Sequence, residues 1–273
     1  MEQQNGQALQ KNRRVGADNE RVKEMKTTKK RWLIVILITV IAAMFIGYAL
    51  LYDSDYSVSG ADVNTENEAL PEYVEIQKQM IDLNSELGEN TPYPQIYMIA
   101  ETLFKIKGVK QDIAVTQAAD RYIERKALVW YAEKSGIHVT HEEVDRYIEE
   151  LIQAAKGAEN YNEVNEAYKK AGITLEQYYR ENIQFYRDDY LIGKLYNQWI
   201  HDCGSGDEVS ESEMELLDEA WQEKVSEIKN SYQSIREYKK LKPLIAESKK
   251  IYRNGSADTL EYLKKADIFI EEK

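Results

Sequence analysis

An uncharged stretch of twenty-one residues near the start of the chain, Trp32–Tyr52, constrains this protein more than any other feature. A helix rises about 1.5 Å per residue, so the stretch would reach roughly 31 Å and match a hydrocarbon core of about 30 Å. Three basic residues at 29–31 precede it, and Asp53 follows it. We therefore predict a single transmembrane helix at residues 32–52.

The charges on either side of this stretch predict its orientation. Residues 1–31 contain nine Lys and Arg against four Asp and Glu, a net charge of +5, so the chain total of −12 leaves −17 for the remainder. Positive flanks stay in the cytoplasm. We expect residues 1–31 to form a cytoplasmic leader and the acidic remainder to lie outside the cell membrane.

A cleaved secretory signal is the alternative for the same stretch. Small residues at 57–59 resemble a cleavage site. The apolar run is longer than the usual signal core of about 7–15 residues, and the leader before it is also long. These lengths favour an uncleaved anchor.

The rest of the chain divides into a linker and one folded region. Residues 53–68 are rich in Ser and Asn and lack apolar periodicity, which is typical of a linker. Residues 69–273 are expected to form one extracytoplasmic helical domain. Its acidic balance argues against binding nucleic acid, and no phosphate-binding glycine motif indicates a nucleotide site. Cys203 is the one cysteine, so the domain needs packing rather than disulfides for stability.

Local signals predict a mainly helical, all-α fold. A helix is expected over residues 113–135, with Gly136 as its C-cap. Thr140 and Thr174 each precede Glu or Gln by three residues, which is the pattern of a capping box. The second box should open one long helix reaching Trp199. Pro71 can start a helix, Pro243 should interrupt one, and the apolar residues 268–270 could form a short terminal strand.

Two short motifs resemble a known family. Residues 133–144 read Glu-Lys-Ser-Gly-Ile-His-Val-Thr-His-Glu-Glu-Val, and residues 171–179 read Ala-Gly-Ile-Thr-Leu-Glu-Gln-Tyr-Tyr. This arrangement resembles the N-terminal, substrate-holding domain of the SurA and PrsA secretion foldases, best over residues 110–200. Residues 260–270 look like the closing helix and strand of that family. The resemblance implies a helical domain that binds unfolded polypeptides outside the cytoplasm.

One departure from this family bears on catalysis. Relatives that isomerise prolyl bonds carry an inserted parvulin domain of roughly a hundred residues. Here a short interval rich in Lys and Glu separates the helix containing Trp221 from Thr259. We therefore expect no parvulin domain and no enzymatic activity.

The histidines and the cysteine do not suggest a catalytic or metal site. His138 and His141 lie three residues apart, but the expected helix begins between them, so the two rings need not share a face. His201 lies two residues from Cys203 without a third group to orient the pair. Neither set supplies the ligands of a zinc site. We expect no metal, no cofactor and a surface position for these residues.

The aromatic residues are the candidates for ligand contact. The chain has twenty tyrosines, and many gather on the helices expected at 113–135 and 174–199. Core packing accounts for most of them, because Tyr buries its ring and keeps its hydroxyl hydrated. Others could line a groove for unfolded polypeptide. The candidate residues are Tyr122, Trp130, Tyr131, Tyr178, Tyr179, Phe185, Tyr186, Tyr190 and Trp199.

These observations lead to one hypothesis with two alternatives. The chain is expected to be a membrane-anchored, extracytoplasmic, chaperone-like protein that binds unfolded or secreted polypeptides without covalent chemistry. The first alternative is a docking module for one partner in an envelope or secretion assembly, which would ignore generic denatured proteins. The second is a degenerate peptidyl-prolyl isomerase, which would catalyse exchange at a prolyl bond.

Overall fold

The computed structural model describes residues 65–88, 91–203 and 211–254, all within one compact unit, Gly60–Lys273. Within these ranges the chain forms nine α-helices and one π-helical turn, without strands, which confirms the all-α prediction. The expected leader, transmembrane helix and terminal strand lie outside the described residues. Among the helices that are described, none is long and apolar enough to cross a membrane.

The helices follow one another with short connections. In chain order they are α3 (Thr65–Leu87), α4 (Tyr93–Glu101), the π-helical η2 (Thr102–Ile106), α5 (Gln111–Lys134), α6 (His141–Lys156), α7 (Tyr161–Lys170), α8 (Leu175–Glu181), α9 (Ile183–Asp202), α10 (Glu211–Ser234) and α11 (Arg236–Asn254).

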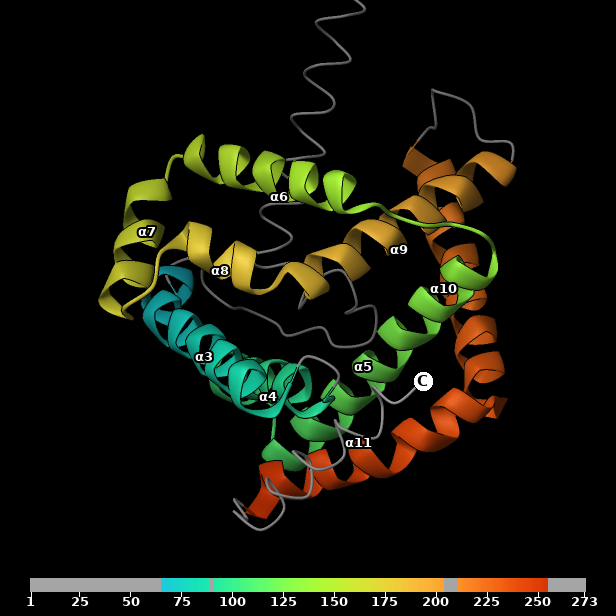
Figure 1. Ribbon diagram of the computed structural model, residues 1–273, viewed down its shortest axis with the longest axis horizontal. Helices are drawn as coiled ribbons and strands as arrows, with labels where there is room; N and C mark the ends of the chain where they lie inside the picture. Colours follow the sequence, from blue (N-terminus) through green and yellow to red (C-terminus); the bar gives the residue numbers. More distant parts are fainter. Residues whose placement is uncertain (1–64, 89–90, 204–210, 255–273) are drawn as a thin grey trace, which may run out of the picture. The chain divides into compact units, whose positions relative to one another are not determined.

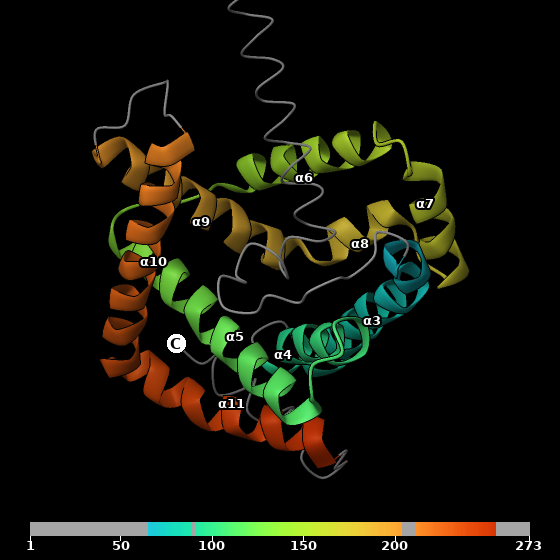
Figure 2. The same cartoon turned by 180° about the vertical axis from the view of Figure 1, so that it is seen from behind.

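Helix α5 is the centre of the larger of two cores. It packs against α4, α9, α10 and α11, and both views place it between the α3–α4 pair and α10 (Figures 1 and 2). Its alanines bring neighbouring helices close, since Ala114, Ala118, Ala127 and Ala132 are fully buried. The resulting core buries a continuous apolar stripe of α5 on several partners.

A second, smaller core joins α3 to α6, α7 and α8. Helix α3 contributes Val74 and Ile76, α6 contributes Ile148 and Leu151, and α7 contributes Tyr168; all five are at most 1% exposed. Helix α3 contacts both α7 and α8, so the chain returns to its first described helix after more than 70 residues. Figure 1 shows α7 and α8 beside the upper end of α3.

Both predicted capping boxes are present. The Thr140 hydroxyl accepts from the Glu143 N–H, while the Glu143 carboxylate accepts from the Thr140 N–H at 2.8 Å. Thr174 and Gln177 repeat the arrangement at the start of α8. Gly136 has a φ of +78°, a left-handed conformation that favours glycine, and confirms the predicted end of α5.

Two helix boundaries differ from those predicted. The long helix expected from Thr174 to Trp199 breaks at Asn182, where φ is −107° and ψ is 28°. The Asn182 Nδ2 donates to the Tyr178 carbonyl at 2.8 Å and satisfies a helix-end acceptor. Helix α3 begins at Thr65 rather than at Pro71, which lies within it.

Pro243 also lies inside a helix rather than interrupting one. Helix α11 runs through it from Arg236 to Asn254. The missing proline N–H removes one helical hydrogen bond. The helix continues because residues after the proline, among them Leu244, Ile245 and Ile251, bury its apolar face in the larger core.

Candidate functional site

Three of the candidate tyrosines form a buried cluster around the α8–α9 junction. The rings of Tyr178, Tyr179 and Tyr186 lie 5.1–6.4 Å apart in pairs, and none of the three residues is more than 7% exposed. Gln77 of α3 donates to the Tyr178 hydroxyl at 3.0 Å and accepts from the Tyr168 hydroxyl. Burial raises the pKa of Tyr178 and of Tyr186.

These rings therefore belong to the core and do not line a surface groove. Tyr122 is also buried, at 2% exposure, inside the larger core. A polypeptide could touch Tyr122, Tyr178, Tyr179 or Tyr186 only after the helices opened. The expectation that these four residues contact a ligand is corrected on this ground, because the folded interior already surrounds their rings.

Phe185 lies half-buried against an ionic cluster that joins α5 to α9. The Arg125 guanidinium stacks 4.0 Å from the centre of the Phe185 ring and donates to the Phe185 carbonyl oxygen. The same guanidinium donates to Asp189 at 2.6 Å, and Lys126 contacts Asp188 at 3.3 Å. Burial raises the pKa of Asp189, while Arg125 acts in the opposite direction. Phe185 is thereby held in a fixed position.

Tyr190 is half-buried and belongs to the α6–α9 contact. Its ring stacks on that of Tyr147 with 5.0 Å between centroids and 28° between planes. The Lys194 ammonium lies 5.8 Å from the centre of the Tyr190 ring. This ring pair joins α6 to α9. Tyr190 therefore faces α6 and does not lie with the other half-buried candidates.

The remaining candidates lie with other aromatic residues along α5, α9 and α10. We call the half-buried residues Trp130, Tyr131, Tyr196 and Trp199 the aromatic stripe. The rings of Trp130, Tyr196 and Trp199 rest on two buried rings of α10, and the Tyr131 ring lies beside that of Trp130. The stripe brings together three of the nine predicted residues.

Trp221 and Tyr232 of α10 form the buried layer on which the stripe packs. Trp199 and Tyr196 lie 5.2 and 5.1 Å from Trp221, and Trp130 lies 5.8 Å from Tyr232, all between ring centroids. Trp221 and Tyr232 are 8% and 6% exposed. They lie eleven positions apart in the sequence, which is close to three helical turns and places both on one face of α10. Tyr196, Trp221 and Tyr232 are not among the nine predicted contact residues, although the spacing of Trp221 and Tyr232 is visible in the sequence.

The histidines and Cys203 lie on the surface, as predicted. His138, His141 and His201 are exposed, and His201 is 3.6 Å from the neighbouring Asp202 carboxylate. Cys203 ends α9 and is exposed. Among the residues whose structure is described, no three His, Cys, Asp or Glu side chains lie close enough together to hold a metal ion.

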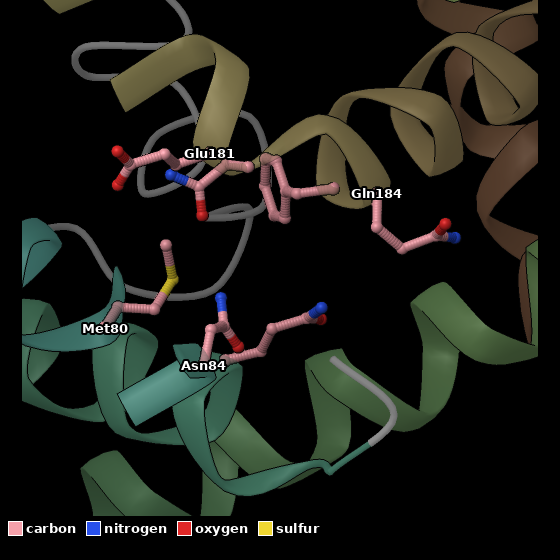
Figure 3. Close-up of a pocket in the computed structure, with 7 residues that line it drawn as sticks. Met80, Asn84, Glu181 and Gln184 are labelled. Carbon is pink, nitrogen blue, oxygen red and sulfur yellow. The ribbon is translucent and has the colours of Figure 1, made fainter. Parts of the chain in front are cut away.

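A small open cavity lies beside the α8–α9 junction. It has a volume of about 310 Å³, including space open to solvent. Figure 3 shows Met80 and Asn84 on one side and Glu181 and Gln184 on the other. Gln95, Asn182 and Phe185 complete the lining. We call this cavity the junction notch.

Comparison with known proteins places these features in a family. The family model described as a SurA-like N-terminal domain matches residues 22–185, more than half of the chain. No curated protein and no solved structure gives a significant match. A domain of this kind is generally linked to polypeptide substrates and suggests a chaperone-like or foldase-related role. The chain belongs to the SurA-like N-terminal domain family, as the two motifs near Thr140 and Thr174 predicted.

Proposed function

We propose that this protein is a chaperone-like factor that binds unfolded or translocated polypeptide segments through the aromatic stripe, without covalent chemistry. The family supports binding of polypeptides in general. The observation that carries the proposal is the stripe itself, four half-buried aromatic residues on two helices, α5 and α9.

The stripe has the properties of a surface that accepts many sequences. Ring faces gain free energy from contact area without requiring one pattern of hydrogen bonds. Trp221 and Tyr232 hold the rings of Trp130, Tyr196 and Trp199 in place, so a ligand does not have to order these three. Leu216 of α10, five residues before Trp221, is 66% exposed and adds apolar surface to the same helix.

We further propose that residues 32–52 tether this domain to the outer face of the cell membrane. The length of the uncharged stretch and the +5 charge of residues 1–31 support this position. The test is extraction of the full-length protein from membranes. A tethered protein requires detergent, whereas release by alkaline carbonate would contradict the tether.

Aggregation of a denatured test protein, followed by light scattering, tests the binding proposal. Residues 60–273 contain every described helix and should slow aggregation at a stoichiometric ratio. Trp199→Ala and Tyr131→Ala should weaken this effect, because each removes an outer ring of the stripe. Tyr161→Ala is the matched control, since Tyr161 is also half-buried but lies on α7, away from the stripe.

The outcomes of this assay distinguish loss of binding from loss of folding. Equal circular dichroism spectra and melting temperatures establish that the variants are folded. Unchanged aggregation in the presence of the wild-type protein would contradict the proposal. In that case a pull-down that recovers one specific partner would favour the docking module instead.

A further inference from the structure

Helix α11 carries a strong positive charge in an otherwise acidic domain. Its residues include seven Lys and Arg against two Glu, a net charge of +5, whereas the chain beyond residue 31 carries −17. Both views place α11 along one edge of the fold, with α6 at the opposite edge (Figures 1 and 2). The positive charge is therefore concentrated on one side of the domain.

The cations of α11 share the side of the helix that faces solvent. The other side is buried in the larger core through Leu244, Ile245 and Ile251. Ala246 is exposed and lies near the middle of the solvent side. Six cations are exposed and one, Lys249, is half-buried. We call the seven the basic face: Arg236, Lys239, Lys240, Lys242, Lys249, Lys250 and Arg253.

Most charges of the basic face have no carboxylate partner. Lys250 lies 3.4 Å from Glu247. Arg253 lies 2.8 Å from Asp112 at the start of α5. The other five form no ion pair with any residue whose structure is described: Arg236, Lys239, Lys240, Lys242 and Lys249. On the preceding helix, α10, both Lys224 and Lys229 pair with carboxylates.

The positions of these cations do not favour the helix itself. Arg236 is the first residue of α11, where the helix dipole disfavours positive charge. Lys239 and Lys240 follow it by three and four positions, the spacings at which like charges on a helix repel each other. An anionic partner would offset both costs, so the arrangement favours a role in binding over a role in stability.

The shape of the basic face indicates the kind of anionic partner. Its cations extend over about 26 Å of helix, from Arg236 to Arg253, rather than surrounding a pocket. Such a spread fits an extended anionic surface. The exposed large apolar side chains in the described part of the chain are Phe104, Ile113 and Leu216, and none of them lies on α11. Contact with charged headgroups therefore fits this face better than insertion between lipid chains.

We propose that the basic face docks onto the anionic lipid headgroups of the membrane to which the domain is tethered. This inference rests on the tether proposed for residues 32–52. Residues 53–64 can extend over at most about 43 Å, so the tether would keep α11 close to the bilayer. The acidic remainder of the domain is repelled by the same surface, which leaves the basic face as the side that can approach it.

Docking through α11 would also orient the aromatic stripe. Figure 1 shows α10 rising from one end of α11. Trp221, beneath the stripe, lies thirteen residues before the end of α10 at Ser234, a distance of about 20 Å along the helix. This distance exceeds two Debye lengths at physiological salt, each about 8 Å. The stripe would thus stay clear of the headgroups.

The test uses the full-length protein reconstituted into vesicles of phosphatidylcholine, with or without phosphatidylglycerol. A membrane-impermeant donor dye is attached to one cysteine from outside, and the vesicles contain an acceptor-labelled lipid. One sample is labelled at Cys203, the exposed cysteine at the end of α9. The other carries Ala246→Cys in a Cys203→Ser background and reports on the basic face. Resonance energy transfer measures how close each dye lies to the lipid.

Energy transfer from residue 246 should increase when phosphatidylglycerol is present and decrease when NaCl is raised from about 0.1 M to about 1 M, because salt screens the attraction. Transfer from Cys203 should stay lower than transfer from residue 246 in the anionic vesicles.

The variant Lys239→Gln/Lys240→Gln/Lys242→Gln removes three unpaired cations. It should lower the docking equilibrium constant about 100-fold, since each Lys or Arg near an anionic surface contributes about fivefold. The matched control, Lys156→Gln/Lys169→Gln/Lys170→Gln, removes the same charge from exposed residues of α6 and α7 and should dock like the parent. Equal melting temperatures establish that both variants are folded.

Three results would overturn this proposal. The first is equal transfer from residue 246 in the two kinds of vesicle, and the second is an equal loss of transfer in both triple variants. The third is a response of residue 246 to added polyglutamate but not to lipid composition, which would assign the basic face to an acidic polypeptide.

Failure of the tether would be recognised separately. A protein without the tether would not float with vesicles of phosphatidylcholine alone. In that case, flotation with the anionic vesicles that is lost in Lys239→Gln/Lys240→Gln/Lys242→Gln would still support the basic face, and absence of flotation with either vesicle would reject it.

Discussion

Arg125 on α5 donates a hydrogen bond to Asp189 on α9 at 2.6 Å, and the arginine side chain is only 3% exposed. Asp188, at 1% exposure, lies 3.9 Å from the same guanidinium. A charged cluster is thus buried where the central helix meets the helix that carries part of the aromatic stripe. The contacts of this cluster hold both Phe185 and the start of α9 in place.

Replacing this arginine should strongly destabilise the domain. Arg125→Met would leave the partly buried Asp189 carboxylate without its cation and remove one of the cations near the buried Asp188, a change that typically costs about 3–5 kcal/mol. The free energy of unfolding in urea, followed by circular dichroism, measures the loss. Arg180→Met is the control, because the Arg180 side chain is 52% exposed and pairs with Glu176 at 3.2 Å, outside this cluster. That variant should lose less than about 1 kcal/mol, and equal losses in the two variants would contradict the central role of Arg125.

The hydroxyl groups of two buried tyrosines should contribute differently to stability, because only one of them has a hydrogen-bond partner. Tyr168→Phe removes the donor to Gln77 and leaves a buried amide oxygen unpaired, which should cost about 1–3 kcal/mol. The hydroxyl of Tyr179 makes no hydrogen bond within the described residues, so Tyr179→Phe should change stability by less than about 1 kcal/mol. Urea denaturation of both variants provides the comparison. A larger loss for Tyr179→Phe would refute this assignment.

The two capping boxes should contribute independently to stability. Thr140→Ala and Thr174→Ala each remove a side-chain acceptor for an N–H at a helix start, which typically costs about 1 kcal/mol. Thr140→Ser and Thr174→Ser keep that acceptor and should recover most of the loss. Thermal unfolding of the four variants separates the effects. Serine variants as unstable as the alanine variants would show that the threonine methyl group matters instead.

Glu143 should make the free energy of unfolding depend on pH in the acidic range. Its carboxylate accepts from the Thr140 N–H at 2.8 Å and from Lys194 at 3.0 Å, and these hydrogen bonds hold its pKa below the usual value. The folded state therefore favours the charged form. This contribution is present above the unfolded pKa, about 4.3, and is lost as the pH falls through the lower folded value.

Glu143→Gln isolates this contribution, because a glutamine at this position retains the cap, as Gln177 does beside Thr174. The stability difference between the wild type and the variant should shrink as the pH falls from about 6 to about 3. Urea midpoints across that range provide the measurement. Glu150→Gln, an exposed residue of α6, is the control and should follow the wild type. A constant difference for Glu143→Gln would contradict the role of its carboxylate.

Signals that act within one helical turn were predictable from the sequence. The pairs Thr140–Glu143 and Thr174–Gln177 each lie three residues apart, and Gly136 needs only its own backbone freedom to end α5. Such features depend on neighbouring residues alone, which is why the helix starts and the family motifs were predictable together.

The break at Asn182 was not predictable in the same way. Residues 174–199 have continuous helical periodicity, and the α8–α9 junction depends on how Tyr178 and Tyr186 pack in the smaller core. The junction notch follows from that break, because its lining combines residues of α3, α4 and the junction itself. Contacts over a hundred residues of sequence carry no local signal.

The sequence by itself determined the helical class, the helix starts with their caps, and an abundance of aromatic residues. Only the tertiary structure decided which rings became core and which formed a surface. Tyr178 and Trp199 lie on consecutive helices with similar apolar spacing, yet α3 covers the region of the first while the second remains half-exposed beside α10. The physical reason is that burial depends on which distant helix packs over a ring, whereas capping depends on atoms within one turn.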